Sequence, residues 1–318
     1  MVPEYNLQDS RNMPNTKELR RRIRSVKNMS QITKAMQMVA ATKMRRAQNQ
    51  ATAGRPYTTT LNKAVMALLS KLGENITHSL ITKNSSDTAA ALVITTDKGL
   101  CGSLNTNIFK VVMQFTMNDE RKTNNPVFYT IGKKGRNFIA KMGKDLIADF
   151  ENSDLVTFRT ASQIGKLVSK SFIAGEIGSF SVIYPNFVSA LRQEPVVMPL
   201  LPINLESLKD FYDMTLQEKD TSNKKQETNE DGTEDFLFEP NLSELLDFIV
   251  THYVQVKIYQ ALLETKASEH SARMIAMQNA TDNAKELVTD LTLSYNQTRQ
   301  AGITNELLEI TSALAALE

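Results

Sequence analysis

The sequence predicts an α/β domain inserted between two long terminal helices that pair as an antiparallel coiled coil. Three observations lead to this prediction: an apolar repeat near the start, alternating strand and helix signals in the middle, and a second, longer apolar repeat at the end. The expected divisions are an extension (1–14), a first helix (15–73), the α/β domain (88–204), a polar loop and foot segment (205–240) and a last helix (241–318).

The first helix is expected to begin at Asn15, because Glu18 three residues later completes a capping-box pattern. Apolar side chains then recur in steps of three or four, and we expect them to form one buried face: Ile23, Val26, Met29, Ile32, Met36 and Val39. Gly54 and Pro56 interrupt this pattern, which resumes and stops at Gly73.

The middle of the chain alternates between strand and helix signals. Short apolar runs rich in β-branched and aromatic residues predict three strands, at Ala90–Thr96, Pro126–Gly132 and Phe180–Val188. Helical segments are expected around 106–117, 134–142 and 161–175. Because this alternation is typical of parallel sheets with crossover helices, we expect a Rossmann-like α/β domain.

The last helix follows a polar tract, Gln217–Asp235, that we expect to be a solvated insertion. From Leu242 to Thr298, steps of four and three mark seventeen positions, of which thirteen are apolar, and this predicts a coiled coil. The repeat slips by one residue at Gly302. The last helix exceeds the first by roughly 20 residues, about 30 Å at 1.5 Å per residue, so its end should project and need a partner protein.

The charge is distributed unevenly between the two helices. Residues 15–55 contain eleven Lys/Arg and one acid, whereas residues 241–318 contain ten acids and five Lys/Arg. We therefore expect the helices to pair, with burial of the seam as the main contribution and charge as a modest one.

Composition excludes several classes of site. The single cysteine, Cys101, cannot form an internal disulfide, and the three histidines are far apart in the sequence, so no metal site and no cofactor are expected. No apolar run approaches the length of a membrane span, and the first residues resemble neither a secretory signal nor a transit peptide.

Two motifs allow a different function. The segment "DKGLCGSLN" follows a strand and could suggest an enzyme that binds nucleotides, but it matches neither phosphate-loop pattern, so we expect a tight turn in which Gly99 and Gly102 supply backbone freedom. The basic first helix could bind nucleic acid, but residues 15–55 contain no aromatic side chain, and the chain carries its own acidic partner helix.

Three segments resemble the gamma subunits of F-type ATP synthases: "SVKNMSQITKAMQMVAATKMRRAQ", "TTDKGLCGSLNTNI" and "SEHSARMIAMQNATDNA…YNQTRQAGITNELLEI". The resemblance extends from about Asn15 to Leu317. It implies a non-catalytic central shaft, present once per complex, that couples proton or sodium flow to ATP synthesis by rotating inside the alpha–beta hexamer. The chain departs from the family at Gly302, where Ala or Ser is usual, and at its last residues.

The resemblance also implies contact residues and a location. Contacts with the catalytic subunits fall on Lys34, Met36, Arg299, Gln300 and Thr304, and contacts with the membrane c-ring fall on Phe238 and Glu239. The implied partners are the alpha and beta subunits, the epsilon subunit and the c-ring, with no nucleic acid. The implied place is the cytoplasmic face of a bacterial inner membrane or, alternatively, the matrix side of the mitochondrial inner membrane.

Overall fold

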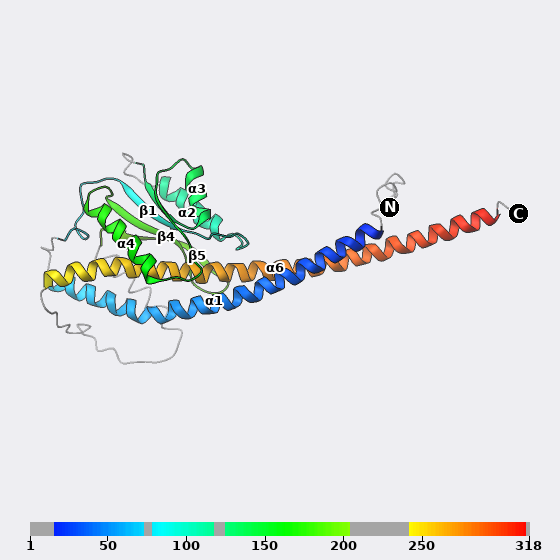
Figure 1. The fold of residues 1–318 in the computed structure, drawn as a ribbon, viewed down its shortest axis with the longest axis horizontal. Helices are drawn as coiled ribbons and strands as arrows, with labels where there is room; N and C mark the ends of the chain where they lie inside the picture. Colours follow the sequence, from blue (N-terminus) through cyan, green and yellow to red (C-terminus); the bar gives the residue numbers. More distant parts are fainter. Residues whose placement is uncertain (1–15, 73–77, 118–124, 204–241, 316–318) are drawn as a thin grey trace, which may run out of the picture. The chain divides into compact units, whose positions relative to one another are not determined.

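The computed structural model describes residues 16–72, 78–117, 125–203 and 242–315 (Figure 1). The chain divides into two compact units. One unit, here called the helical pair, comprises Met1–Ala40 and Met274–Glu318, and the other, the domain unit, comprises Ala41–Arg273. Two long helices, α1 (Thr16–Leu72) and α6 (Leu242–Ala315), contribute to both units.

The domain unit contains a five-stranded sheet with the strand order β3-β2-β1-β4-β5. Its strands are β1 (Ala89–Ile94), β2 (Val127–Ile131), β3 (Leu146–Phe150), β4 (Ser179–Phe187) and β5 (Gln193–Leu201). The first four strands run parallel to their neighbours, whereas β5 pairs antiparallel with β4 through a hairpin. The predicted Rossmann-like sheet is confirmed, with an antiparallel strand added at one edge.

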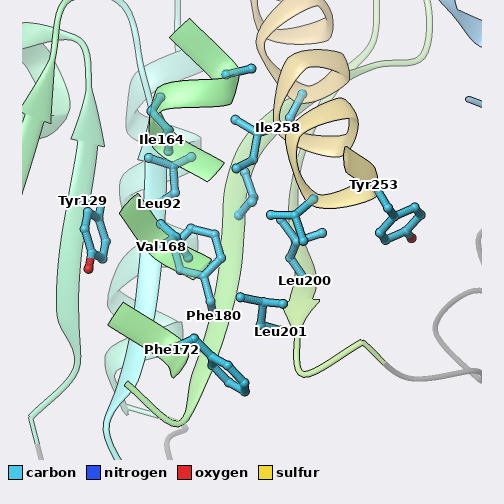
Figure 2. Close-up of a cluster of buried hydrophobic side chains, with 14 of the residues drawn as sticks. Leu92, Tyr129, Ile164, Val168, Phe172, Phe180, Leu200, Leu201, Tyr253 and Ile258 are labelled. Atoms are coloured by element: carbon cyan, nitrogen blue, oxygen red, sulfur yellow. The ribbon is translucent and has the colours of Figure 1, made fainter. Parts of the chain in front are cut away.

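Helices cover both faces of the sheet. Helices α2 (Leu104–Met117) and α3 (Lys133–Lys141) lie on one face, where Ala91 and Val93 of β1 point (Figure 1). On the other face, Leu92 joins a larger core with α4 (Phe158–Ile173) and α6, in which Phe172, Phe180 and Ile258 are fully buried (Figure 2). Because β1 is buried on both faces, its residues form a continuous apolar run.

Two strands, β3 and β5, are not among those that the sequence predicts. Strand β3 is a short edge strand whose residues alternate in exposure. Strand β5 contains Pro195 and Pro199, and prolines are unusual in a central strand but are tolerated at a sheet edge, where β5 lies. Helix α1 does not break at Gly54 and Pro56. A proline inside a helix costs about 3 kcal/mol. Burial of Ala51 and Val65 on either side helps to offset this cost.

In the helical pair, α1 and α6 run antiparallel and meet along a seam that buries small and hydroxyl side chains together with larger apolar ones such as Leu19. The Thr33 and Thr281 hydroxyls share a buried hydrogen bond of 2.7 Å, and the Gln37 amide donates to Gln278 at 3.5 Å. The seam positions predicted for this part of α6 are the inward ones: Met277, Thr281 and Ala284 are buried. The seam is therefore a coiled coil in which small, hydroxyl and larger apolar side chains are buried together.

The buried face predicted for α1 is correct at three of its six positions. Ile23, Val26 and Met36 are half-buried, but Met29, Ile32 and Val39 are each more than half exposed. The inward positions are instead Ser30, Thr33, Gln37 and Ala40. Both sets recur every three or four residues, and the smaller side chains form the seam because they allow closer approach of α6. The larger apolar side chains form a second stripe that faces outward.

We expect Gly132→Ala to destabilise the protein by about 2–4 kcal/mol, because this residue has a left-handed backbone and an added Cβ would lie 2.4 Å from the Thr95 carbonyl oxygen. Gly143→Ala is the matched control, since Gly143 also has a positive φ but has open space around it, and should cost about 1–2 kcal/mol. Urea unfolding of the two variants checks this, and equal losses would contradict it.

Candidate functional site: contact surfaces of the helical pair and the domain junction

The end of α6 is an apolar helix with no partner helix in the described part of the chain. Because Thr33 lies beside Thr281, the first residue of α1 lies roughly level with residue 298 of α6. Beyond that level five large apolar side chains are at least half exposed: Ile303, Leu307, Leu308, Ile310 and Leu314. A continuous exposed apolar surface of this kind is typical of a segment that another protein encloses.

The predicted polar contact residues lie at two separate places. Lys34 is exposed and donates to Gln37, and Met36 is half-buried beside the seam. Arg299, Gln300 and Thr304 are exposed, and the Thr304 hydroxyl donates to the Gln300 carbonyl oxygen of its own helix. Lys34 is level with residues near 280, so the two places are roughly 30 Å apart along α6 at 1.5 Å per residue. Phe238 and Glu239 lie outside the described residues.

Most of the basic side chains near the start of α1 are exposed to solvent. Arg20, Arg21, Arg24 and Lys27 are all exposed. The ion pairs described within the helical pair, Arg22–Glu18 and Lys285–Asp282, each join residues of one helix. The exposed basic side chains of α1 are thus accessible to a partner protein, and exposed ion pairs such as these two contribute little to stability.

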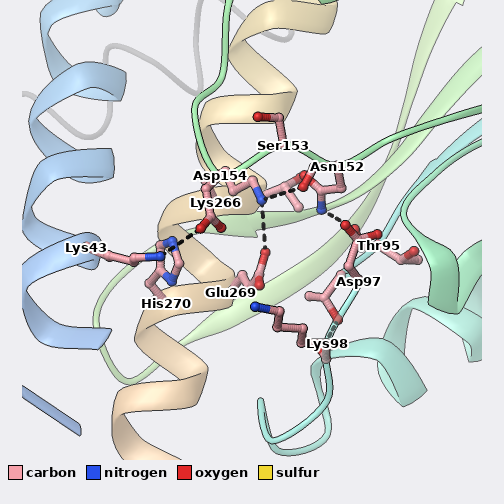
Figure 3. A network of polar contacts seen from close by, with 12 residues as sticks. Lys43, Thr95, Asp97, Lys98, Asn152, Ser153, Asp154, Lys266, Glu269 and His270 are labelled. Atoms are coloured by element: carbon pink, nitrogen blue, oxygen red, sulfur yellow. Dashed lines mark hydrogen bonds and ion pairs between the residues drawn. The ribbon is translucent and has the colours of Figure 1, made fainter. Parts of the chain in front are cut away.

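The domain unit contains a polar network where α1 and α6 meet the ends of the strands (Figure 3). We call Lys43, Asn152, Asp154, Lys266, Glu269 and Arg273 the junction. From α1, Lys43 forms a 2.8 Å ion pair with Asp154, which follows β3. From α6, the Lys266 ammonium donates to the Asn152 carbonyl oxygen at 3.3 Å and lies 3.5 Å from Glu269. The sequence analysis did not find this network, because its members are far apart in sequence and match no motif.

One histidine adjoins the junction. The pKa of His270 is lowered from 6.5 to about 4, mainly by burial, with Glu269 opposing the shift and the cations Arg273, Lys266 and Lys43 adding to it. Arg273 donates toward His270 Nδ1 at 3.5 Å, so the imidazole is a neutral acceptor at that nitrogen. The Lys43 ammonium, by its hydrogen bond, lowers the pKa of Asp154.

The segment after β1 is a turn, as predicted, and its side chains hold one another. Asn105 accepts from the Thr96 backbone N–H and donates to the Thr96 hydroxyl and to Cys101. The left-handed residues are Leu100 and Gly102, so the expected role of Gly99 in backbone freedom is wrong. Within the described residues, no His, Cys, Asp and Glu side chains group to hold a metal ion, and no helix is long and apolar enough to cross a membrane.

These features define a class of protein: a helical shaft subunit whose working surfaces face other subunits. Comparison with known proteins places the chain within that class. The family described as ATP synthase matches residues 15–317. The ATP synthase gamma chain of Methylacidiphilum infernorum is 41% identical over 310 residues, covering 96% of this chain and all of the relative. That of Roseiflexus castenholzii is 41% identical over 307 residues, covering 96% and 99%.

Solved structures agree with this placement. A chain from the central stalk and c-ring of the Tetrahymena thermophila mitochondrial ATP synthase is 26% identical, with a TM-score of 0.58 over 78% of this chain and 99% of that chain. A chain from the Euglena gracilis enzyme, 20% identical, shares the fold with a TM-score of 0.63 over 95% and 94% of the two chains. The chain belongs to the ATP synthase gamma-chain family, which confirms the predicted family, fold and rotor role.

Acid should destabilise the protein partly through His270. Its pKa is lower in the folded state, so between pH 6.5 and about 4 the unfolded chain binds a proton that the folded chain does not, and stability falls as the pH falls through this window. We expect roughly 2–3 kcal/mol of this fall to disappear in His270→Gln. Urea unfolding of both proteins from pH 7 to 4 measures the difference, and parallel curves would contradict the assignment.

Proposed function

We propose that this chain is the single, non-catalytic rotor shaft of an ATP synthase, and that the exposed surfaces of its helical pair are the parts that act on the catalytic subunits. The observation that carries this proposal is the apolar tip beyond residue 298, where helix α6 continues without a partner helix among the described residues. An exposed apolar tip is typical of a segment that another protein encloses, and an alpha–beta hexamer offers an enclosing cavity.

The helical pair presents different chemistry on different sides. The outward stripe of Met29, Ile32 and Val39 is apolar, whereas Arg20 and Lys27, which share another side of α1, are basic. A shaft with unequal sides presents a different surface to each of three surrounding catalytic subunits. Each site's affinity for nucleotide then depends on the angle of the shaft, and this coupling free energy acts in both directions. Ion flow that turns the shaft drives synthesis, and hydrolysis turns it backwards.

Arg299, Gln300 and Thr304 are the proposed contacts with a loop of one catalytic subunit at a time. Arginine suits this role because its planar guanidinium pairs with carboxylates through two hydrogen bonds. Lys34 and Met36 form the proposed second contact point, about 30 Å away along the shaft. Both places are accessible on the helical pair. Phe238 and Glu239 remain the proposed contacts with the c-ring.

The proposed partners are the alpha and beta subunits, the epsilon subunit and the c-ring, with no nucleic acid. The proposed location is peripheral, on the cytoplasmic face of a bacterial inner membrane, and bacterial relatives about 40% identical over nearly the whole chain support this choice over the mitochondrial matrix. No residue of this chain is proposed to take part in the chemistry of ATP.

Native mass spectrometry of the tagged chain, purified from solubilised membranes of its host, tests the proposal. We expect three copies each of two nucleotide-carrying subunits for one copy of this chain. A chain that is recovered alone or with nucleic acid would refute the rotor proposal. The second result would point instead to the basic face of α1.

Arg299→Ala should lower ATP-driven proton pumping several-fold, since a hydrogen bond to a charged group contributes about 1.5–3 kcal/mol. The isolated chain should remain folded, because Arg299 is exposed and alanine favours helix. Lys285→Ala, which removes a charge from the same helix away from the proposed contact, is the control. Unchanged pumping and assembly in Arg299→Ala would contradict the assigned contact.

A further inference from the structure

The contacts of α6 with the rest of the domain unit change character along the helix. From Leu246 to Leu262, α6 contributes apolar side chains to the main core. Beyond that, Ala267 makes a small apolar contact with Ala47 and Phe187, and polar groups provide most of the remaining contacts. Apolar contacts are not directional and permit small rotations, whereas hydrogen bonds and ion pairs fix the orientation of the groups they join.

The polar part of α6 reaches the ends of several strands. Lys266 donates to Asn152 after β3, Ser268 donates to the Pro185 carbonyl oxygen in β4, and Ser271 donates to the Ala190 carbonyl oxygen in the hairpin that follows. Arg273 donates to Gly99 after β1 at 3.4 Å. In two turns, one helix is thus joined to four segments of the sheet and its turns.

The contact at Asn152 continues into the sheet. Its side-chain amide donates to the Thr95 carbonyl oxygen at 2.6 Å, and the Thr95 hydroxyl accepts from the Gly135 backbone N–H at 2.8 Å at the start of α3. An unbroken series of hydrogen bonds therefore links Lys266 of α6 to the carboxyl ends of β1, β2 and β3. Asn152 and Lys266 are both more than nine-tenths buried, so water does not compete for these bonds.

The same loop is also held by the other helix. Asp154 lies two residues after Asn152 and pairs with Lys43 of α1 (Figure 3). Along the chain, Lys43 lies just after the α1 segment of the helical pair, and Arg273 lies just before its α6 segment. The junction therefore holds both helices at the last residues that they contribute to the domain unit.

We propose that the junction is a torsional joint: Lys266, paired with Glu269 and bonded to Asn152, fixes the rotational position of helix α6 on the α/β domain, and Lys43–Asp154 does the same for α1. Lys266 is thus a positioning residue that transmits rotation without touching a catalytic subunit. This inference rests on the proposed rotor function.

The test is a single-molecule rotation assay on the complete alpha–beta–gamma complex, with a bead attached to one introduced cysteine. Cys101 is buried, so labelling is selective. In one series the bead is attached at Lys141→Cys, on exposed α3 of the α/β domain, and in the other at Arg46→Cys, on exposed α1. The measured quantity is the width of the bead's thermal angular fluctuation during each catalytic pause.

We expect Lys266→Met to widen the fluctuation when the bead is on the α/β domain and to leave it unchanged when the bead is on α1, since only the first arrangement places the joint between bead and hexamer. Lys285→Met, which removes an exposed charge from the same helix, should change neither. No widening at Lys141→Cys, or equal widening at both positions, would overturn the joint, because equal widening means general softening.

A second pair of variants tests the joint where folding is less at risk, because Lys43 and Asp154 are both substantially exposed. Lys43→Asp should widen the fluctuation through repulsion between two carboxylates, and adding Asp154→Lys should restore the original width. Failure of the double variant to restore it would overturn the role of this pair. A wild-type complex that does not rotate would instead refute the proposed function, and this inference with it.

Discussion

The burial of the seam between α1 and α6 is the interaction on which most other features of the helical pair depend. In proteins most of the stability of a helix comes from packing of its inward face, and here each helix supplies that packing to the other. Thr33 and Thr281 bond across the seam, and Ala40 and Ala284 fill it. Met29, Ile32 and Val39 are left on the outside, together with many basic side chains of α1. The pair is consequently well packed within and able to bind on several sides, as a shaft surrounded by other subunits requires.

The domain unit uses the same helices in another way. In open α/β sheets, ligands usually bind beyond the carboxyl ends of the strands, where the strand order reverses. In this chain the polar side chains of α6 reach that edge, and Arg273 and Lys266 bond to the backbone there. The edge of the sheet at which such architectures often bind nucleotides is thus bonded to helix α6 in this chain. Function here cannot be inferred from the fold alone and follows from the surfaces.

Burying the charges of the junction costs free energy, but their hydrogen bonds and ion pairs fix the relative orientation of the groups that they join. Moving Lys266, Glu269 and Arg273 out of water carries a desolvation penalty that their attraction only partly offsets. Apolar residues could fill the same space with similar stability. Apolar residues could not define one angular position of the helix as sharply, because their contacts are not directional. A buried donor and its acceptor, in contrast, are both satisfied in one arrangement only. A rotor needs a well-defined angular position of its helix more than it needs additional stability.

The sequence by itself determined the two terminal helices, their unequal lengths, the alternating middle domain and the family motifs, because apolar periodicity and turn residues are encoded locally. Only the tertiary structure decided which stripe of α1 is the seam, since Met29 and Ser30 begin stripes of the same period and the choice depends on how closely α6 can approach. It also decided that β5, with its two prolines, is an edge strand. The junction likewise required the fold, because Lys43, Asn152 and Lys266 become neighbours only when distant segments pack together.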